Sequence, residues 1–263
     1  MSQYLTKPFN NIPRPALAII FLWFLLMTSI PIVLWLTTGP LPASLITASV
    51  VVQATAVFLL LTHAQGLPHT LAQLGLISLI TFTAEYIGTH TGLLFGAYTY
   101  TDRLQPQLGQ VPLLIPLAWF MMLLPAAATI HHLNLPRHYA IPLAALALTS
   151  WDLLLDPQMV SWDLWQWHNP GLYFGIPLQN FLGWFLTALL LYTLIPFPPK
   201  AYPGGRLLFT LTWFLETFGL ALFWGQPGPA LIGGTIMGLF VWLSWQPLLT
   251  SPKTQKSELL HQQ

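Results

Sequence analysis

Asp152 and Asp156 lie four residues apart in an otherwise apolar run, inside the stretch SWDLLLDPQMVSWDLWQW that begins at Ser150. In a helix this spacing places both side chains on one face, one turn apart. Pro157 predicts a helix end at Asp156, where the helix dipole, the second carboxylate and the apolar surroundings all disfavour an anion. We therefore expect at least one of the two acids to keep its proton near pH 7 and to act as a general acid.

Glu85, in the stretch FTAEYIGTHTG, is a third acid in an apolar run, and its titration would be coupled to that of the aspartates. Such acids can cap helix ends or pair with Arg103 at an interface. Each ionisable group inside a membrane costs about 2.5–3.5 kcal/mol, however, so three of them together favour a functional role. Glu216 lies in another apolar run and should face the protein interior, with its role left open.

Aromatic residues crowd the same parts of the chain, namely Trp151, Trp162, Trp165, Trp167, Tyr98, Tyr100 and Tyr173. One interpretation is the belt of tryptophan and tyrosine found at membrane interfaces. The other is an aromatic pocket, because ring faces stabilise a desolvated cation by roughly 2 kcal/mol. An acid beside such a pocket suits protonation of an alkene, where a carbocation must survive until water captures it.

The composition indicates a membrane protein with many spans. Of the 263 residues, 55% are hydrophobic and only 6% are charged, whereas soluble domains carry about 25% charged residues. There is no cysteine, which excludes disulfides, thiolate metal sites and cysteine nucleophiles. The net charge of +1, without any cluster of basic residues, argues against a nucleic-acid partner.

The predicted fold is an all-α, polytopic helix bundle that forms a single transmembrane domain over residues 1–263. About twenty apolar residues cross a bilayer as a helix. Eight runs qualify, with seven spans as the alternative: 16–37, 41–62, 70–90, 111–133, 138–156, 177–195, 206–224 and 228–249. Gly and Pro mark most of the junctions, and no internal repeat suggests an inverted-repeat transporter.

The distribution of basic residues favours eight spans over seven. With eight, one side of the membrane holds Lys7, Arg14, Arg137, Lys200, Arg206, Lys253 and Lys256, and the other holds only Arg103. The positive-inside rule then makes both termini cytoplasmic, with tails at about 1–15 and 250–263. The long loops 91–110 and 157–176 fall together on the opposite face, toward which Glu85 and the aspartate pair should point.

Four motifs that occur in order over about residues 75–190 resemble one family. They are AEYIGTHTGLLFGAYTYTDRLQP, VPLLIPLAWFMM, SWDLLLDPQMVSWDLWQW and YFGIPLQNFLGW. Together they resemble the CruF-type carotenoid biosynthesis proteins, integral-membrane carotenoid 1,2-hydratases related to bisanhydrobacterioruberin hydratase. The resemblance implies addition of water across the terminal isopropylidene double bond of an acyclic carotenoid end, such as that of lycopene or gamma-carotene. The product would be a tertiary 1-hydroxy carotenoid, made without any cofactor or metal.

On this interpretation Asp152 or Asp156 donates the proton, and Glu85 is its partner or the base that orients water. The substrate would be bound by Trp119, Trp151, Tyr98, Tyr100, Tyr173, Phe174, Asn180 and Trp184, with Asn180 and Tyr98 holding the water. The partners would be a carotenoid from the bilayer, water and other membrane enzymes of the pathway. The location would be a prokaryotic plasma membrane or an internal photosynthetic membrane.

Two other functions are compatible with acids in a membrane. DLLLD has the DxxxD spacing of UbiA-like prenyltransferases, in which acids bind magnesium diphosphate, but those enzymes need a second acidic motif and several basic residues on the cytoplasmic side. A proton-coupled transporter would also use buried acids. A structural subunit would leave all three acids unexplained.

Overall fold

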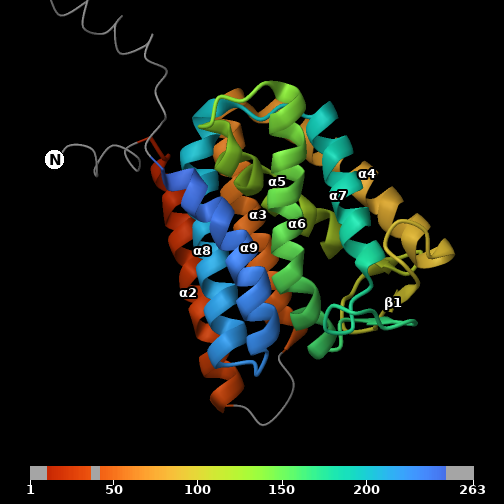
Figure 1. Ribbon diagram of the computed structural model, residues 1–263. Coiled ribbons are helices and arrows are strands. Elements are labelled where there is room, and N and C mark those ends of the chain that lie inside the picture. The colour runs from red at the N-terminus through yellow and green to blue at the C-terminus, as the bar shows by residue number, and fades with distance from the viewer. Residues whose placement is uncertain (1–10, 37–41, 247–263) are drawn as a thin grey trace, which may run out of the picture.

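The computed structural model describes residues 11–36 and 42–246, and within them the protein is an all-α bundle of eight α-helices (Figure 1). The helices are α2 (Arg14–Leu36), α3 (Ala43–Gln65), α4 (Leu67–Thr91), α5 (Leu114–His131), α6 (Arg137–Ser161), α7 (Leu178–Leu194), α8 (Tyr202–Leu222) and α9 (Pro227–Trp245). A 3-10 turn, η1 (Pro199–Ala201), precedes α8. The prediction of an all-α membrane bundle is confirmed, and each predicted span corresponds to one helix.

Length and hydropathy qualify six of these helices as membrane spans, namely α2, α3, α4, α5, α6 and α9. The α7 helix is apolar but has 17 residues, about 25 Å at 1.5 Å per residue. The α8 helix has 21 residues but is less apolar, since it contains Arg206 and Glu216. Both pack beside the six in the bundle, where Asn180 of α7 and Glu216 of α8 are buried.

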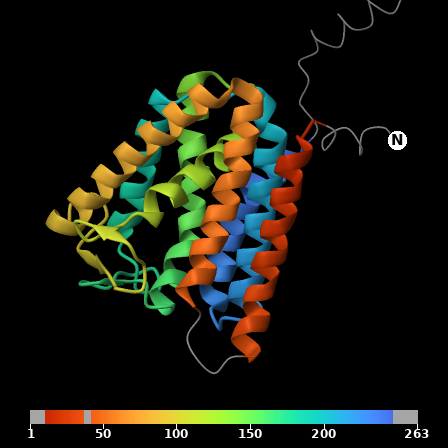
Figure 2. The same ribbon diagram turned by 180° about the vertical axis from the view of Figure 1, so that it is seen from behind.

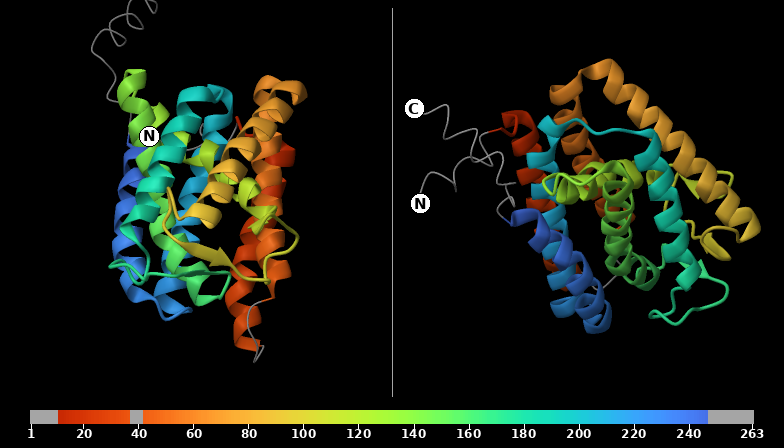
Figure 3. Two further views of the ribbon diagram at one scale, coloured as in Figure 1. Left: turned by 90° about the vertical axis from the view of Figure 1, so that its right-hand side faces the viewer. Right: turned by 45° about the horizontal axis from the view of Figure 1, so that its top comes forward.

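The centre of the bundle is α5. Its most apolar 18-residue stretch is 72% buried, more than that of any other candidate span, and the helix lies among the others in the tilted view of Figure 3. In contrast, α4 leaves its neighbour α3 at Gly66 and runs obliquely away from it (Figure 2). A left-handed glycine, with φ +85°, makes this sharp change of direction possible.

The two long loops meet at one end of the bundle, as predicted. Strand β1 (Tyr98–Tyr100) pairs antiparallel with β4 (Trp165–Trp167), so that Tyr98 faces Trp167 and Tyr100 faces Trp165. The first loop also contains the short pair β2 (Gln107–Leu108) and β3 (Val111–Pro112). Because alternate residues of a strand share a face, all four aromatic rings of β1 and β4 lie on the inner face.

The prediction that the fifth span ends at Asp156 is wrong, because α6 continues through Pro157 to Ser161. A proline inside a helix has no N–H for the carbonyl four residues earlier, which here belongs to Leu153. The hydroxyl of Tyr173, in the following loop, donates to that carbonyl at 3.0 Å. With its lost hydrogen bond replaced in this way, the helix carries Asp156 one turn inside its end.

We therefore expect Tyr173→Phe to lower stability by about 1 kcal/mol, since it removes the donor to a carbonyl that has no helical partner. Thermal unfolding in detergent measures this loss. Tyr139→Phe is the matched control, because Tyr139 is 59% exposed. Equal melting temperatures for the two variants would contradict the assigned role of Tyr173.

A labelling experiment can test the predicted orientation of the protein in the membrane. The helix order places Arg14, Arg137, Lys200 and Arg206 at one end of the bundle and Arg103 at the other, while Lys7, Lys253 and Lys256 lie outside the described residues. Since the chain lacks cysteine, single substitutions can be labelled directly. We expect Asn169→Cys to react from the outside of intact cells, and Lys200→Cys to react only after permeabilisation. The reverse pattern would contradict cytoplasmic termini.

Candidate active site

A cavity of about 70 Å³ lies between the central helices and the β1–β4 pair. Two of the three predicted catalytic acids, Glu85 and Asp156, line it. So do six of the eight predicted substrate-binding residues: Tyr98, Tyr100, Trp119, Trp151, Asn180 and Trp184. Residues far apart in the chain thus converge on one chamber, which is closed at the loop end by the paired strands.

Glu85 accepts hydrogen bonds from three aromatic donors. The hydroxyls of Tyr98 and Tyr100 donate to its Oε2 at 2.5 and 2.8 Å, and the indole N–H of Trp119 donates to its Oε1 at 3.3 Å. Burial, followed by the neighbouring Glu85, raises the pKa of Tyr98 and Tyr100 well above the usual range for a phenol. Both phenols are therefore neutral donors at physiological pH.

The aspartate pair is joined by one amide. The side-chain nitrogen of Asn180, at the start of α7, donates to Oδ2 of Asp152 at 2.7 Å and also to Oδ2 of Asp156. Asp156 receives a second bond at its Oδ1, from the indole N–H of Trp165 at 2.6 Å. Asp156 lines the cavity, whereas Asp152 does not, and the buried Oδ1 of Asp152 has no hydrogen-bond partner among residues 11–36 and 42–246.

The wall beside these acids is built from stacked indoles. The rings of Trp119 and Trp184 stack at a centroid distance of 4.0 Å, and Trp151 meets Trp184 edge-on at 5.8 Å. Indole faces carry negative charge density, so a cation over them is stabilised. The chamber thus combines carboxyl groups with neutral, cation-tolerant rings.

Two predicted substrate-binding residues, Tyr173 and Phe174, are not among the residues that line the cavity. Tyr173 instead holds the Leu153 carbonyl, as described above. Phe174 is 48% exposed and borders a hollow at the α8–α9 turn. Both side chains therefore lie outside the lining of this cavity, and their role in substrate binding stays a prediction.

The structure adds residues that the sequence did not assign. Trp165 and Trp167 line the cavity, as the interpretation of an aromatic pocket expects, while Trp162 packs edge-on against Trp224 at 5.3 Å. The signal for Trp165 and Trp167 was their period-two spacing opposite Tyr98 and Tyr100. Phe95 also lines the cavity, and nothing in its sequence context distinguishes it from a lipid-facing residue.

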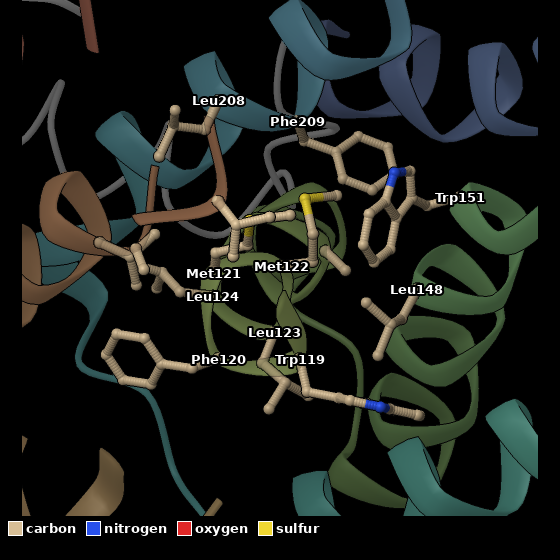
Figure 4. Packing of buried hydrophobic residues seen from close by; sticks show 14 of the residues in the cluster. Trp119, Phe120, Met121, Met122, Leu123, Leu124, Leu148, Trp151, Leu208 and Phe209 are labelled. Carbon is tan, nitrogen blue, oxygen red and sulfur yellow. The ribbon is translucent and has the colours of Figure 1, made fainter. Parts of the chain in front are cut away.

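The structure shows a hydrogen-bond partner for Glu216. It is buried on α8, and its Oε1 accepts the indole N–H of Trp151 at 2.9 Å, while its buried Oε2 has no partner in the part of the chain that the structure describes. The Trp151 ring points from α6 toward Phe209 of α8, as Figure 4 shows. Glu216 therefore fixes the ring plane of a cavity tryptophan from the side away from the cavity.

The sequence profile of a family described as "Carotenoid biosynthesis protein" matches residues 45–240, most of the chain. The chain belongs to this family. The match spans α3 to α9 and includes both loops that build the site, so the resemblance noted over about residues 75–190 is confirmed and extended.

The chain is also similar to bisanhydrobacterioruberin hydratase of Haloarcula japonica, with 32% identity over 126 residues. The aligned part covers 46% of this chain and 43% of that hydratase. The chain thus aligns with less than half of the length of this relative. No solved structure matches the chain.

The bond between Trp151 and Glu216 can be tested in this family member by a double-mutant cycle. We expect Trp151→Phe to lower stability by about 1–3 kcal/mol, because it leaves the buried Glu216 carboxyl with no donor. Trp151→Phe combined with Glu216→Leu removes both polar groups and should recover most of that loss. Additive losses, measured by thermal unfolding, would contradict the coupling.

Proposed function

We propose that this protein is a carotenoid hydratase that adds water across the terminal isopropylidene double bond of an acyclic carotenoid end. The product is a tertiary 1-hydroxy carotenoid. The observation that carries this proposal is the convergence of Asp156 and Glu85 on one cavity walled by uncharged aromatic rings. The family and the hydratase relative support the reaction class.

In the first step Asp156 is the proton donor. Two carboxyl groups that share the amide of Asn180 in a water-poor interior repel each other when both are ionised, so the pair holds a proton. The π electrons of the alkene take that proton at the less substituted carbon. A C–H bond forms, the carboxyl O–H bond breaks, and the positive charge rests on the tertiary carbon.

In the second step water captures the cation. Its oxygen forms the new C–O bond, and its excess proton passes to Glu85, which the donors Tyr98, Tyr100 and Trp119 hold in place. Return of this proton to the aspartate pair restores the starting state. The balance is one alkene plus one water to one alcohol, so neither oxidant nor reductant enters the reaction.

Asp152 acts in this proposal as a positioning residue. It shares Asn180 with Asp156 but does not line the cavity, so it shapes the proton affinity of the pair without touching the substrate. The expected role of Asn180 changes with this geometry. Both of its amide hydrogens are directed to the aspartates, and so it fixes the acids rather than donating to water.

The decisive experiment is expression in a host that accumulates lycopene or gamma-carotene. We expect pigments whose mass has increased by one water. UbiA-like prenyl transfer would instead add an isoprenoid unit, and a transporter would leave the pigment unchanged.

Substitution of the acids tests the assignment of roles. We expect Asp156→Asn and Glu85→Gln to lower the rate by about 10²–10⁴-fold, the usual loss for a general acid or base, with folding preserved. Asp152→Asn should cost less, because that side chain acts through Asp156. Asp163→Asn is the matched control, since Asp163 is exposed and bonds Gln166. Turnover near the wild-type value in both Asp156→Asn and Glu85→Gln would overturn the mechanism.

A further inference from the structure

The cavity lining combines two chemical kinds of residue. The acids, Asn180 and the tryptophans supply the polar and aromatic part, whereas α3 and α5 contribute aliphatic residues. These aliphatic residues include Ile46 and Val50 of α3 and Leu114 and Ala118 of α5. The α3 and α4 helices diverge from Gly66 (Figure 2), and the cavity takes lining residues from both of them and from α5.

The burial of these residues indicates which side reaches the bilayer. Ile46 and Val50 are buried, while Leu114 and Ala118 are partly exposed although they lie on the central helix of the bundle. Both residues also line the cavity, to which α3 contributes Val50 and α4 contributes Glu85. Leu114 and Ala118 are four residues apart, so they share one face of α5.

The cavity volume limits what can enter. On the measure by which the cavity has about 70 Å³, one water needs about 10–15 Å³, so the cavity accommodates the end of a long polyene and not its whole length. The rest of a long polyene must lie outside the chamber, in apolar surroundings. We propose that the opening between α3 and α4, over Leu114 and Ala118, is the lateral portal through which a rod-like isoprenoid inserts one end from the bilayer. This inference rests on the proposed function, because the occupant is its substrate.

A second apolar groove, of about 440 Å³, runs between α4 and α7 and shares no lining residue with the cavity. Phe95, which lines the cavity, packs closely against both helices: a Cβ placed on Gly88 or on Gly183 would lie 2.8 or 2.6 Å from its ring. The ring is thus clamped between the two helices, and a third groove, between α2 and α8, shares no lining residue with the cavity.

The portal determines how a substrate with two acyclic ends is processed. Only one end of the carotenoid fits the chamber at a time, and the other end stays in the bilayer. The enzyme therefore recognises the terminal unit and not the whole molecule. A symmetric carotene would then leave after the first hydration and enter again by its other end.

The first test fills the portal. We expect Ala118→Phe to raise the KM for a full-length acyclic carotenoid about tenfold, with little effect on a short linear isoprenoid hydrocarbon carrying the same end group. Leu114→Ala in the same chain should reverse part of this effect, which separates steric blockage from misfolding. Ala127→Phe controls for bulk on α5, and Thr83→Phe fills the α4–α7 groove. A KM increase with Thr83→Phe and none with Ala118→Phe would overturn the portal.

The second test does not depend on turnover. A linear isoprenoid that carries a photoreactive diazirine beyond its terminal unit is crosslinked to the protein in lipid vesicles and mapped by mass spectrometry. Labels on α3 and α5 around Val50 and Ala118 support the portal, even if no hydration is found, in which case only the proposed reaction fails. Labels confined to 79–87 and 186–190, or the absence of specific labelling, would contradict it.

Discussion

The structure depends on how four carboxyl groups are kept inside an apolar bundle. A buried polar group without a partner costs about 1–3 kcal/mol, and a carboxylate costs more, so each acid must be supplied with donors. Glu85, Asp156 and Glu216 each accept an indole N–H, and one amide joins the aspartates. The donors come from α5, α6, α7 and the β1–β4 pair. This requirement explains why the loops carry aromatic strands and why they fold back onto the bundle.

The continuation of α6 past Pro157 belongs to the same scheme. If the helix ended at the proline, Asp156 would lie in a loop. The helix would then no longer hold its side chain on the same face as that of Asp152. The Tyr173 hydroxyl replaces the missing helical hydrogen bond at Leu153, so the helix extends for another turn and holds both acids on one rigid face. A residue remote from the chemistry thereby sets the geometry of the acid pair.

The spans were predictable because an apolar run of about twenty residues has few alternatives to a helix in lipid. The acid pair was predictable from its spacing and from the cost of burying charge. The end of α6 was not predictable. The hydroxyl that donates to the Leu153 carbonyl comes from Tyr173, in a loop whose path depends on tertiary contacts. The position of Phe95 and the hydrogen bond between Trp151 and Glu216 could not be predicted either, since both arise from packing between helices that are far apart in sequence.

The choice of donors bears directly on the proposed chemistry. A lysine or arginine would satisfy a buried carboxylate more strongly than an indole, but it would hold the acid in its ionised form and repel a carbocation. An indole N–H is an uncharged donor whose ring face attracts cations. Trp119 uses both properties, because its N–H contacts Glu85 while its ring stacks on Trp184 in the wall. Aromatic donors therefore let the same side chains hold the acids and line the path of the cation, and a membrane interior with few cations is suited to this combination.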